Sequence, residues 1–295
     1  MKNLSKSKYT TYCQCPKALW LRINKPEEQI IDPSVQSRFE AGSEVGELAK
    51  RLFGEFEDVT TYVPMDDGSQ CLDLKAMIAK TQDCLNRNVE NIAEAAFSYD
   101  GCYCAVDILH KTENGYAIYE VKSSTDLSHL EVYAQDVAYQ KYVLTNCGIN
   151  VTGTYLVNIN NEYVLDGELN VKEFFNISDI SEAVADEYLK VPTRIAQAKQ
   201  MLEGGEPERD FGEYCHKPYG CTFWEYCSRD IIPHPSVFDL YRMSFKKALE
   251  HMNEGRLTLE NMREEKLTDT QQLQLECTLG DKTYINKDGI KEFLT

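Results

Sequence analysis

The sequence predicts an α/β fold in which helices flank a mixed β-sheet. Segments with the apolar period of helices alternate with β-rich runs along the first two thirds of the chain, which is the element order of α/β proteins. Two β-rich runs, at 106–108 and 119–121, flank Asn114-Gly115, a dipeptide typical of tight hairpin turns. We therefore expect the sheet to be organised around this hairpin.

The elements on either side of the hairpin follow from caps, breakers and periodicity. Residues 4–21 predict a serine-capped helix, a break at Pro16 and a second helical turn. Further helices are predicted at 34–53, 72–89, 127–147, 177–202, 237–254 and 268–277. Strands or strand-like runs are predicted at 59–63, 151–157, 162–165 and 282–286.

Composition limits the class of protein. With 295 residues, 42% of them hydrophobic, the chain is long enough to bury a full core in one large domain or two. It has no run approaching the ~20 apolar residues of a membrane span, and residues 1–6 lack the apolar stretch of a secretory signal, so we expect a cytoplasmic protein. Eleven cysteines, an odd number, favour thiols over disulfides, some of them on a metal.

The net charge of −17 argues against extensive contact with nucleic acid, because polyanion binding usually needs a basic surface. The charge is unevenly distributed, however, since residues 1–25 contain six Lys or Arg and no acid. Tyr9, Tyr12 and Trp20 in this segment suit stacking on a single strand, and core packing explains them equally well. The sequence is therefore compatible with a local groove for DNA, and no membrane partner is expected.

The hairpin contains a candidate catalytic site. Successive side chains of a strand alternate between faces, so Glu120 and Lys122 project together, and Asp107 on the neighbouring strand lies near Glu120. Two carboxylates supply the hard oxygen ligands that Mg²⁺ or Mn²⁺ prefers, and a nearby ammonium stabilises developing negative charge. The alternative interpretation is a surface hairpin with a cross-strand ion pair.

A second candidate site lies in the last third of the chain. Cys215, Cys221 and Cys227 recur at a regular spacing among aromatic residues, Gly and Pro, which favours a metal site over chance clustering. Three thiolates need a fourth ligand. His216 would complete a zinc site, but it directly follows Cys215, which makes a tetrahedron difficult to close.

In combination, these features resemble the iron–sulfur branch of the RecB-like PD-(D/E)xK nucleases, which includes CRISPR-associated RecB-family exonucleases and the nuclease domain of AddB. The resemblance depends on the Asp107…Glu120-x-Lys122 spacing, on Cys15-Pro16 and on the late cysteines, and it covers about residues 4 to 230. It implies a restriction-endonuclease-like sheet flanked by helices, with an iron–sulfur cluster joining the N- and C-terminal segments.

The resemblance also implies which residues serve each role. The 4Fe-4S ligands would be Cys15, Cys215, Cys221 and Cys227. Cys13 is an alternative first ligand, and the six-residue steps of the trio are wider than the first pair common in those exonucleases. The catalytic residues would be Asp107, Glu120, Lys122, Gln135 and Tyr139. The last two match a QxxxY motif that engages the DNA strand in the family, and Gln140 gives an alternative register.

One motif departs from the family pattern. A Gly-x-x-x-His sequence usually supplies a histidine ligand to the metal, but residues 42–46 place a glycine there. Glu44 or Glu47 could replace the histidine, and we favour Glu44 as the third metal ligand beside Asp107 and Glu120. The departure raises the question of full activity.

These expectations define a domain organisation and a function. The predicted parts are a cluster-binding N-terminal segment, a nuclease core, a cysteine-rich cluster-binding segment and a helical extension, at 1–33, 34–205, 206–232 and 233–295. The expected activity is a Mg²⁺- or Mn²⁺-dependent DNA exonuclease acting on single strands, in CRISPR-associated antiviral defence or repair, with other nucleic-acid-processing proteins as possible partners. The alternative is a catalytically weak or inactive nucleic-acid-binding or scaffold module of the same fold.

Overall fold

A computed structural model describes residues 3–32, 42–65 and 68–294 of the protein. The chain divides into two compact units: unit 1 contains residues 1–26 and 31–208, and unit 2 contains residues 27–30 and 209–295. The predicted N-terminal segment and nuclease core fall largely in unit 1. The cysteine-rich segment and the C-terminal extension fall largely in unit 2.

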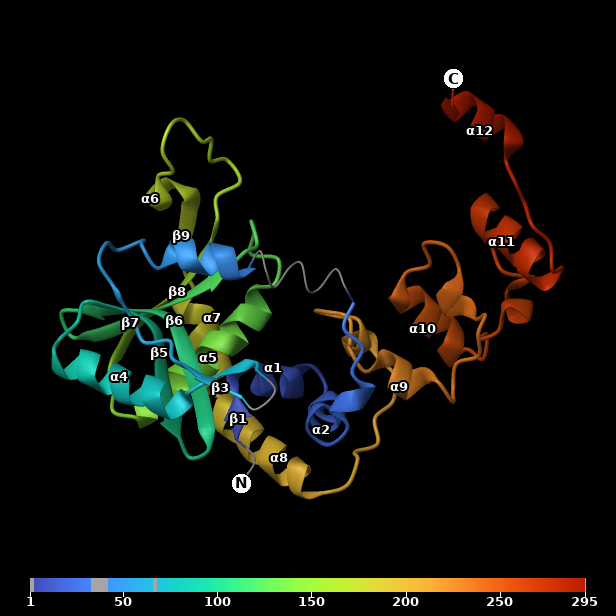
Figure 1. The fold of residues 1–295 in the computed structure, drawn as a ribbon. Helices are drawn as coiled ribbons and strands as arrows, with labels where there is room; N and C mark the ends of the chain where they lie inside the picture. Colours follow the sequence, from blue (N-terminus) through green and yellow to red (C-terminus); the bar gives the residue numbers. More distant parts are fainter. Residues whose placement is uncertain (1–2, 33–41, 66–67, 295) are drawn as a thin grey trace. The chain divides into compact units, whose positions relative to one another are not determined.

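Unit 1 is built on a seven-stranded mixed sheet with the order β2-β5-β6-β7-β8-β9, in which β1 pairs with β6 beside this path (Figure 1). Its strands are β1 (Leu4–Ser5), β2 (Glu57–Asp58), β5 (Asn91–Tyr99), β6 (Cys102–Thr112), β7 (Gly115–Lys122), β8 (Val151–Ile159) and β9 (Phe175–Asp179). The pairs β1–β6, β2–β5 and β7–β8 are parallel and the others antiparallel. A separate antiparallel pair consists of β3 (Tyr62–Pro64) and β4 (Gln70–Leu72).

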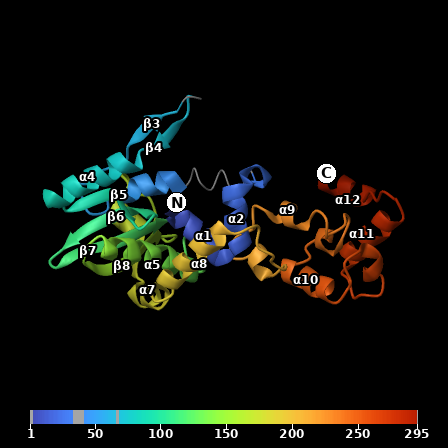
Figure 2. The same ribbon diagram turned by 90° about the horizontal axis from the view of Figure 1, so that it is seen from below.

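Helices flank this sheet, which confirms the predicted mixed α/β class. They are α1 (Lys6–Gln14), α2 (Pro16–Asn24), α4 (Leu74–Asn86), α5 (Leu130–Asn146), α6 (Val171–Phe174), α7 (Ser181–Tyr188) and α8 (Val191–Glu203). Both ribbon views place α1, α5, α7 and α8 side by side (Figures 1 and 2). Residues 42–49 are also helical, and the part of the predicted helix before residue 42 lies outside the described residues.

The two faces of the sheet bury separate cores. The larger core packs α1, α4, α5, α7 and α8 against the sheet and includes Ile118 of β7. The smaller core lies under residues 42–49 and includes Tyr119 and Val121. Because side chains of β7 alternate between these cores, Glu120 projects toward the α5 side. The sequence pattern of β7 thus fixes which face carries the predicted catalytic residues.

The predicted hairpin between β6 and β7 forms, but its two turn residues are Glu113 and Asn114, because Gly115 pairs with Thr112 as the first residue of β7. A Cβ atom at position 115 would lie 2.1 Å from the backbone carbonyl of Asn150, so this position requires glycine. That carbonyl accepts a 2.9 Å hydrogen bond from the Tyr116 amide, at the start of the β7–β8 ladder. Glycine at position 115 therefore allows the backbone that leads into β8 to approach the hairpin closely.

Two predicted elements of unit 1 are wrong. The strand expected at 162–165 does not form, and Val164 and Leu165 are exposed because this run has no neighbouring strand. The single helix expected over 177–202 is instead the end of β9 followed by α7 and α8. Pairing of β9 with β8 overrides the helical pattern at its start, and Pro192 begins a new helix at α8.

Unit 2 consists of short helices around a small core. They are η2 (Glu213–Cys215), α9 (Trp224–Ser228), η3 (Val237–Asp239), α10 (Phe245–Asn253), η4 (Leu259–Met262), α11 (Asp269–Leu279) and α12 (Lys287–Leu294), and a further turn, η1 (Pro26–Glu28), begins in unit 1. The core includes Val237, Leu259 and Met262. The strand-like run predicted at 282–286 is an irregular segment before α12. In the part of the chain that is described, no helix has the length and apolar character needed to cross a bilayer.

Candidate active site

The two predicted carboxylates meet where β7 separates from β6. The β6–β7 ladder ends at the pair Ile108↔Tyr119. Continued by one residue, the same register would place Asp107 opposite Glu120. The ladder does not continue through them. Instead, the Asp107 carboxylate accepts a 2.7 Å hydrogen bond from the Val121 amide. The Asp107 side chain therefore bridges the two strands at the point where they separate, which we call the fork. It brings the two acidic groups together there.

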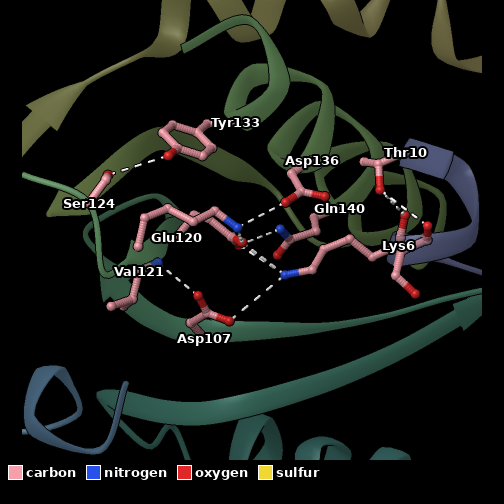
Figure 3. Close-up of polar contacts among 11 residues, drawn as sticks. Lys6, Thr10, Asp107, Glu120, Val121, Ser124, Tyr133, Asp136 and Gln140 are labelled. Carbon is pink, nitrogen blue, oxygen red and sulfur yellow. Dashed lines mark hydrogen bonds and ion pairs between the residues drawn. The ribbon is translucent and has the colours of Figure 1, made fainter. Parts of the chain in front are cut away.

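Glu120 is the centre of the site and is 1% exposed. Lys6 Nζ donates to both of its carboxylate oxygens, at 2.9 and 3.2 Å, and Lys122 Nζ donates to Oε1 at 2.7 Å. Gln140 Nε2 donates to Oε2 at 2.6 Å (Figure 3). Four hydrogen bonds satisfy this buried carboxylate, as burial of a charge requires.

The two carboxylates have opposite pKa shifts. Burial by itself would raise the pKa of Glu120, but attraction to the ammonium groups of Lys122 and Lys6 outweighs it and lowers the pKa to about 2. Burial, and then repulsion from Glu120, raises the pKa of Asp107 to about 6. The negative charge at Asp107 is thus less well compensated, so additional positive charge beside it would be favourable.

Lys122 is held by groups from the strand and from α5. Besides Glu120, its ammonium donates to Asp136 Oδ2 at 3.0 Å and lies 5.5 Å from the centre of the Tyr133 ring. Tyr133, Asp136 and Gln140 are spaced three and four residues apart, so they share one face of α5. Helix α5 was predicted, but the part played by Asp136 was not. The helical periodicity could have revealed this role, because it places Asp136 on the same face of α5 as Tyr133 and Gln140.

Lys6, which is about 100 residues before Asp107 in the sequence, also lies at the site, and its role was not predicted. It is the first residue of α1, after the cap Ser5, and its Nζ lies 3.9 Å from Asp107 Oδ1. Strand β1 pairs with β6 through Leu4↔Cys102, which brings the start of α1 to the fork. No local pattern links these distant segments. The only signal was the acid-free basic composition of residues 1–25.

Tyr139 and Gln135 do not occupy the positions that the QxxxY motif implies. Tyr139 is fully buried; its hydroxyl donates to the Leu4 carbonyl and accepts a 3.1 Å hydrogen bond from the Tyr103 amide. It therefore joins β1 to β6 instead of contacting the carboxylates. Gln135 is half-buried, and no hydrogen bond from it to Glu120 is present among the described residues. Gln140, the alternative register, makes that contact.

Glu44 is not grouped with the carboxylate pair. It is exposed on the helix at 42–49, and the nearby Glu47 forms an ion pair with Lys50. Across residues 3–32, 42–65 and 68–294, no three His, Cys, Asp or Glu side chains are arranged to hold a metal ion. The substitution of the missing family histidine by Glu44 or Glu47 stays a prediction.

Glu94 is a nearby carboxylate that the sequence analysis missed. The β5–β6 register pairs Ala93 with Ile108 and so places Glu94 opposite Asp107. Its backbone has φ = 56°, an uncommon conformation for a non-glycine residue. Burial, and then repulsion from Asp107, raises the pKa of Glu94 to about 7. A carboxyl group additional to those of Asp107, Glu120 and Asp136 therefore contributes to the field at the fork.

The chemistry of the hairpin residues fits a divalent cation. The carboxylates of Asp107 and Glu120 converge on one positive group, the Lys6 ammonium. Gln140 Oε1 is buried without a hydrogen-bond partner among the described residues, so it can accept a hydrogen bond from a bound water. Mg²⁺ is commonly held by one or two carboxylates, with waters and substrate phosphate completing its coordination. Two protein carboxylates are sufficient for such a site.

The predicted cluster ligands lie in different units. Cys15 is buried at the start of α2 in unit 1, and Cys215, Cys221 and Cys227 are half-buried in unit 2. The Cys221 amide donates to the Cys215 carbonyl at 2.9 Å, which draws the chain into a loop before α9. Thiolates suit an iron–sulfur cluster, and ligation by all four cysteines stays a prediction.

His216, considered above as a zinc ligand, packs against an aromatic side chain. Its ring stacks on that of Phe245 with 5.1 Å between centroids. Trp224 also contacts Phe245, at 5.1 Å. These contacts explain why His216 follows Cys215 within an aromatic segment, and they assign the ring a packing role in unit 2.

Comparison with known proteins does not assign a family. No protein-family model matches the chain, and no curated protein matches it. The function is therefore inferred from the fork between β6 and β7, where two strands, the start of α1 and one face of α5 bring three carboxylates and two ammonium groups together.

Proposed function

We propose that this protein is a divalent-metal-dependent DNA nuclease that digests single strands from an end. One observation carries the proposal: Asp107 and Glu120 lie at the fork of two strands and share a cationic partner, with Lys122 bonded to Glu120. Side-chain exposures of 25% for Asp107 and 24% for Lys122 leave both within reach of a substrate. Glu120 is 1% exposed and lies behind them. A bound phosphodiester could therefore contact both the Asp107 carboxylate and the Lys122 ammonium.

The residues of the fork have distinct roles in this proposal. When bound, Mg²⁺ or Mn²⁺ supplies Lewis-acid activation of the phosphate and of the attacking water. Asp107 and Glu120 would hold the ion, and Gln140 Oε1 would accept a hydrogen bond from water. Lys122 donates to the developing negative charge on the phosphate. Asp136 and Glu120 orient the Lys122 ammonium for this task.

The resemblance to RecB-like PD-(D/E)xK nucleases extends the proposal to fold, cofactor and setting. We include a restriction-endonuclease-like core and a structural 4Fe-4S cluster on Cys15, Cys215, Cys221 and Cys227. The mixed sheet with flanking helices and the adjacency of Asp107 to Glu120 support this view. DNA is the proposed partner, and nucleic-acid processing in CRISPR-associated defence or repair is the proposed setting.

The test is cleavage of end-labelled single-stranded DNA with Mg²⁺ or Mn²⁺. Lys122→Ala should reduce the rate by at least ~100-fold, the usual effect of removing one donor to developing negative charge. Lys111→Ala is the matched control: Lys111 lies on the same hairpin, and its ammonium bonds to Asn88 at 2.9 Å. It should retain the wild-type rate. Equal inactivity of wild type and Lys122→Ala across metals and substrates would disprove the enzymatic proposal.

A binding module without turnover is the second candidate. It is favoured by the absence, among the described residues, of a third acidic, His or Cys side chain grouped with Asp107 and Glu120 as a metal site. Fluorescence anisotropy with the same labelled strand separates the two candidates. Binding of DNA without cleavage under any metal condition would establish the binding module.

A further inference from the structure

Lys6 occupies the place where a cation between the two carboxylates would be bound. Its ammonium is 2.9 Å from Glu120 Oε1 and 3.9 Å from Asp107 Oδ1 (Figure 3). Mg²⁺ binds carboxylate oxygens at about 2.0–2.1 Å. An ion at that distance from both carboxylates would therefore lie next to the ammonium, and two positive groups so close repel each other strongly in a site with little water.

Lys6 stands in the way of a cation at the two carboxylates. The ammonium groups of Lys6 and Lys122 pair with the carboxylates of Asp107, Glu120 and Asp136, and Glu94 lies opposite Asp107. A divalent cation between Asp107 and Glu120 would take over the oxygens that face Lys6 and would repel its ammonium. Withdrawal of that ammonium or arrival of an anion relieves the repulsion.

Lys6 can move more readily than Lys122. Lys122 is fixed between Glu120 and Asp136, whereas among the described residues the Lys6 ammonium pairs only with the two carboxylates that the ion would take over. The Lys6 and Lys122 side chains are equally exposed, at 24%, so the difference between them lies in their partners. The long stem of Lys6 allows that movement by rotation about side-chain bonds.

The backbone that carries Lys6 stays in place during such a movement. The Leu4 amide donates to the Gly101 carbonyl at 2.9 Å, and the Leu4 carbonyl is held by the Tyr139 hydroxyl. Ser5 caps the helix by accepting a hydrogen bond from the Lys8 amide. The displaced ammonium would consequently remain beside the fork, where it could pair with a phosphate of a bound substrate.

We propose that Lys6 is an exchangeable cation that couples metal binding to phosphate binding: it competes with the metal for Asp107 and Glu120 in the free protein and pairs with the substrate phosphate once the metal is bound. The inference rests on the proposed nuclease function. It assigns Lys6 to the substrate-binding part of the site. It also requires the metal to bind weakly without DNA and more tightly with it.

The experiment measures Mn²⁺ affinity by calorimetric titration, with and without a single-stranded oligonucleotide that has non-hydrolysable phosphorothioate linkages. The variants are Lys6→Met, which keeps the apolar stem without the charge, and Lys6→Gln, which keeps a hydrogen-bond donor. Lys8→Met is the matched control because it removes the same charge from the same helix, and Lys8 Nζ bonds to the Asn3 carbonyl at 3.1 Å. Thermal unfolding with and without Mn²⁺ shows that each variant is folded and reports binding independently.

In the wild type and in Lys8→Met, the oligonucleotide should tighten Mn²⁺ binding about tenfold or more, within the usual range for coupled sites. Lys6→Met and Lys6→Gln should bind Mn²⁺ at least ~10-fold more tightly than wild type without DNA, and DNA should change that affinity little. Equal Mn²⁺ affinity and equal coupling in wild type and both Lys6 variants would overturn the inference while leaving the nuclease proposal standing. Failure of the wild type and of every variant to bind Mn²⁺ would overturn both the inference about Lys6 and the nuclease proposal.

Discussion

The β6–β7 fork and the cysteine-rich segment of unit 2 present two different problems of assembly. At the fork, Asp107, Glu120 and Lys122 lie on two strands joined by a tight turn, so the register of one hairpin brings them together. The proposed cluster instead needs Cys15 of unit 1 together with cysteines of unit 2. Sites assembled within a hairpin follow from local sequence. Sites assembled from distant segments depend on the arrangement of whole units.

The two regions also differ in how deeply their candidate ligands are buried. Glu120 is 1% exposed and accepts hydrogen bonds from three side chains, so this carboxylate is satisfied within unit 1. The three late cysteines are half-buried: Cys215 ends η2, Cys227 lies in α9, and Cys221 lies between these elements.

The largest effect is expected from removing the late cysteines. Protein purified without oxygen should be brown, absorb near ~400 nm and contain iron, and the triple variant Cys215→Ser, Cys221→Ser, Cys227→Ser should contain none. Cys277→Ser, at a half-buried position of α11, is the control and should keep the iron. A colourless wild-type protein with one zinc per chain would rule out the cluster.

A large loss of stability is expected from Glu120→Ala. The substitution leaves the Lys6 and Lys122 ammonium groups without their shared buried partner, and breaking a buried ion pair costs about 3–5 kcal/mol. Urea denaturation at pH 7 measures the free energy of unfolding. The exposed Glu113 of the same hairpin is the control, and Glu113→Ala should change this free energy by about 0.5 kcal/mol or less. Equal stability of both variants would show that Glu120 is not the centre of a buried network.

A smaller effect is expected from Tyr139→Phe. Loss of the hydroxyl leaves the Leu4 carbonyl and the Tyr103 amide without their shared partner, which should lower the free energy of unfolding by about 1–3 kcal/mol. It should also reduce any nuclease activity, because β1 positions Lys6. Tyr142→Phe on the same helix is the control, since the Tyr142 ring contacts those of Tyr99 and Tyr188. A larger loss from the control would show that this hydroxyl does not join β1 to β6.

The sequence by itself determined the hairpin and the residues closest to it. Asn114-Gly115 located the hairpin to within one residue of its turn at 113–114, and strand alternation put Glu120 and Lys122 on one face. The period of α5 was also readable, although Tyr139 faced the core and Gln140 the site. One helical position turns a side chain by about 100°, so a motif match alone did not settle which residue reaches the carboxylates.

The tertiary structure decided what comes from a distance. The parallel pairing of β1 with β6 delivers Lys6 to Asp107 and Glu120, and pairing with β6 sets Glu94 opposite Asp107. Pairing with β8 likewise turned the start of the helix expected over 177–202 into strand β9. Hydrogen bonding between strands far apart in the chain leaves no periodic signal within either strand. Local sequence therefore fixed the geometry of the hairpin, whereas non-local strand pairing selected the cation that faces it.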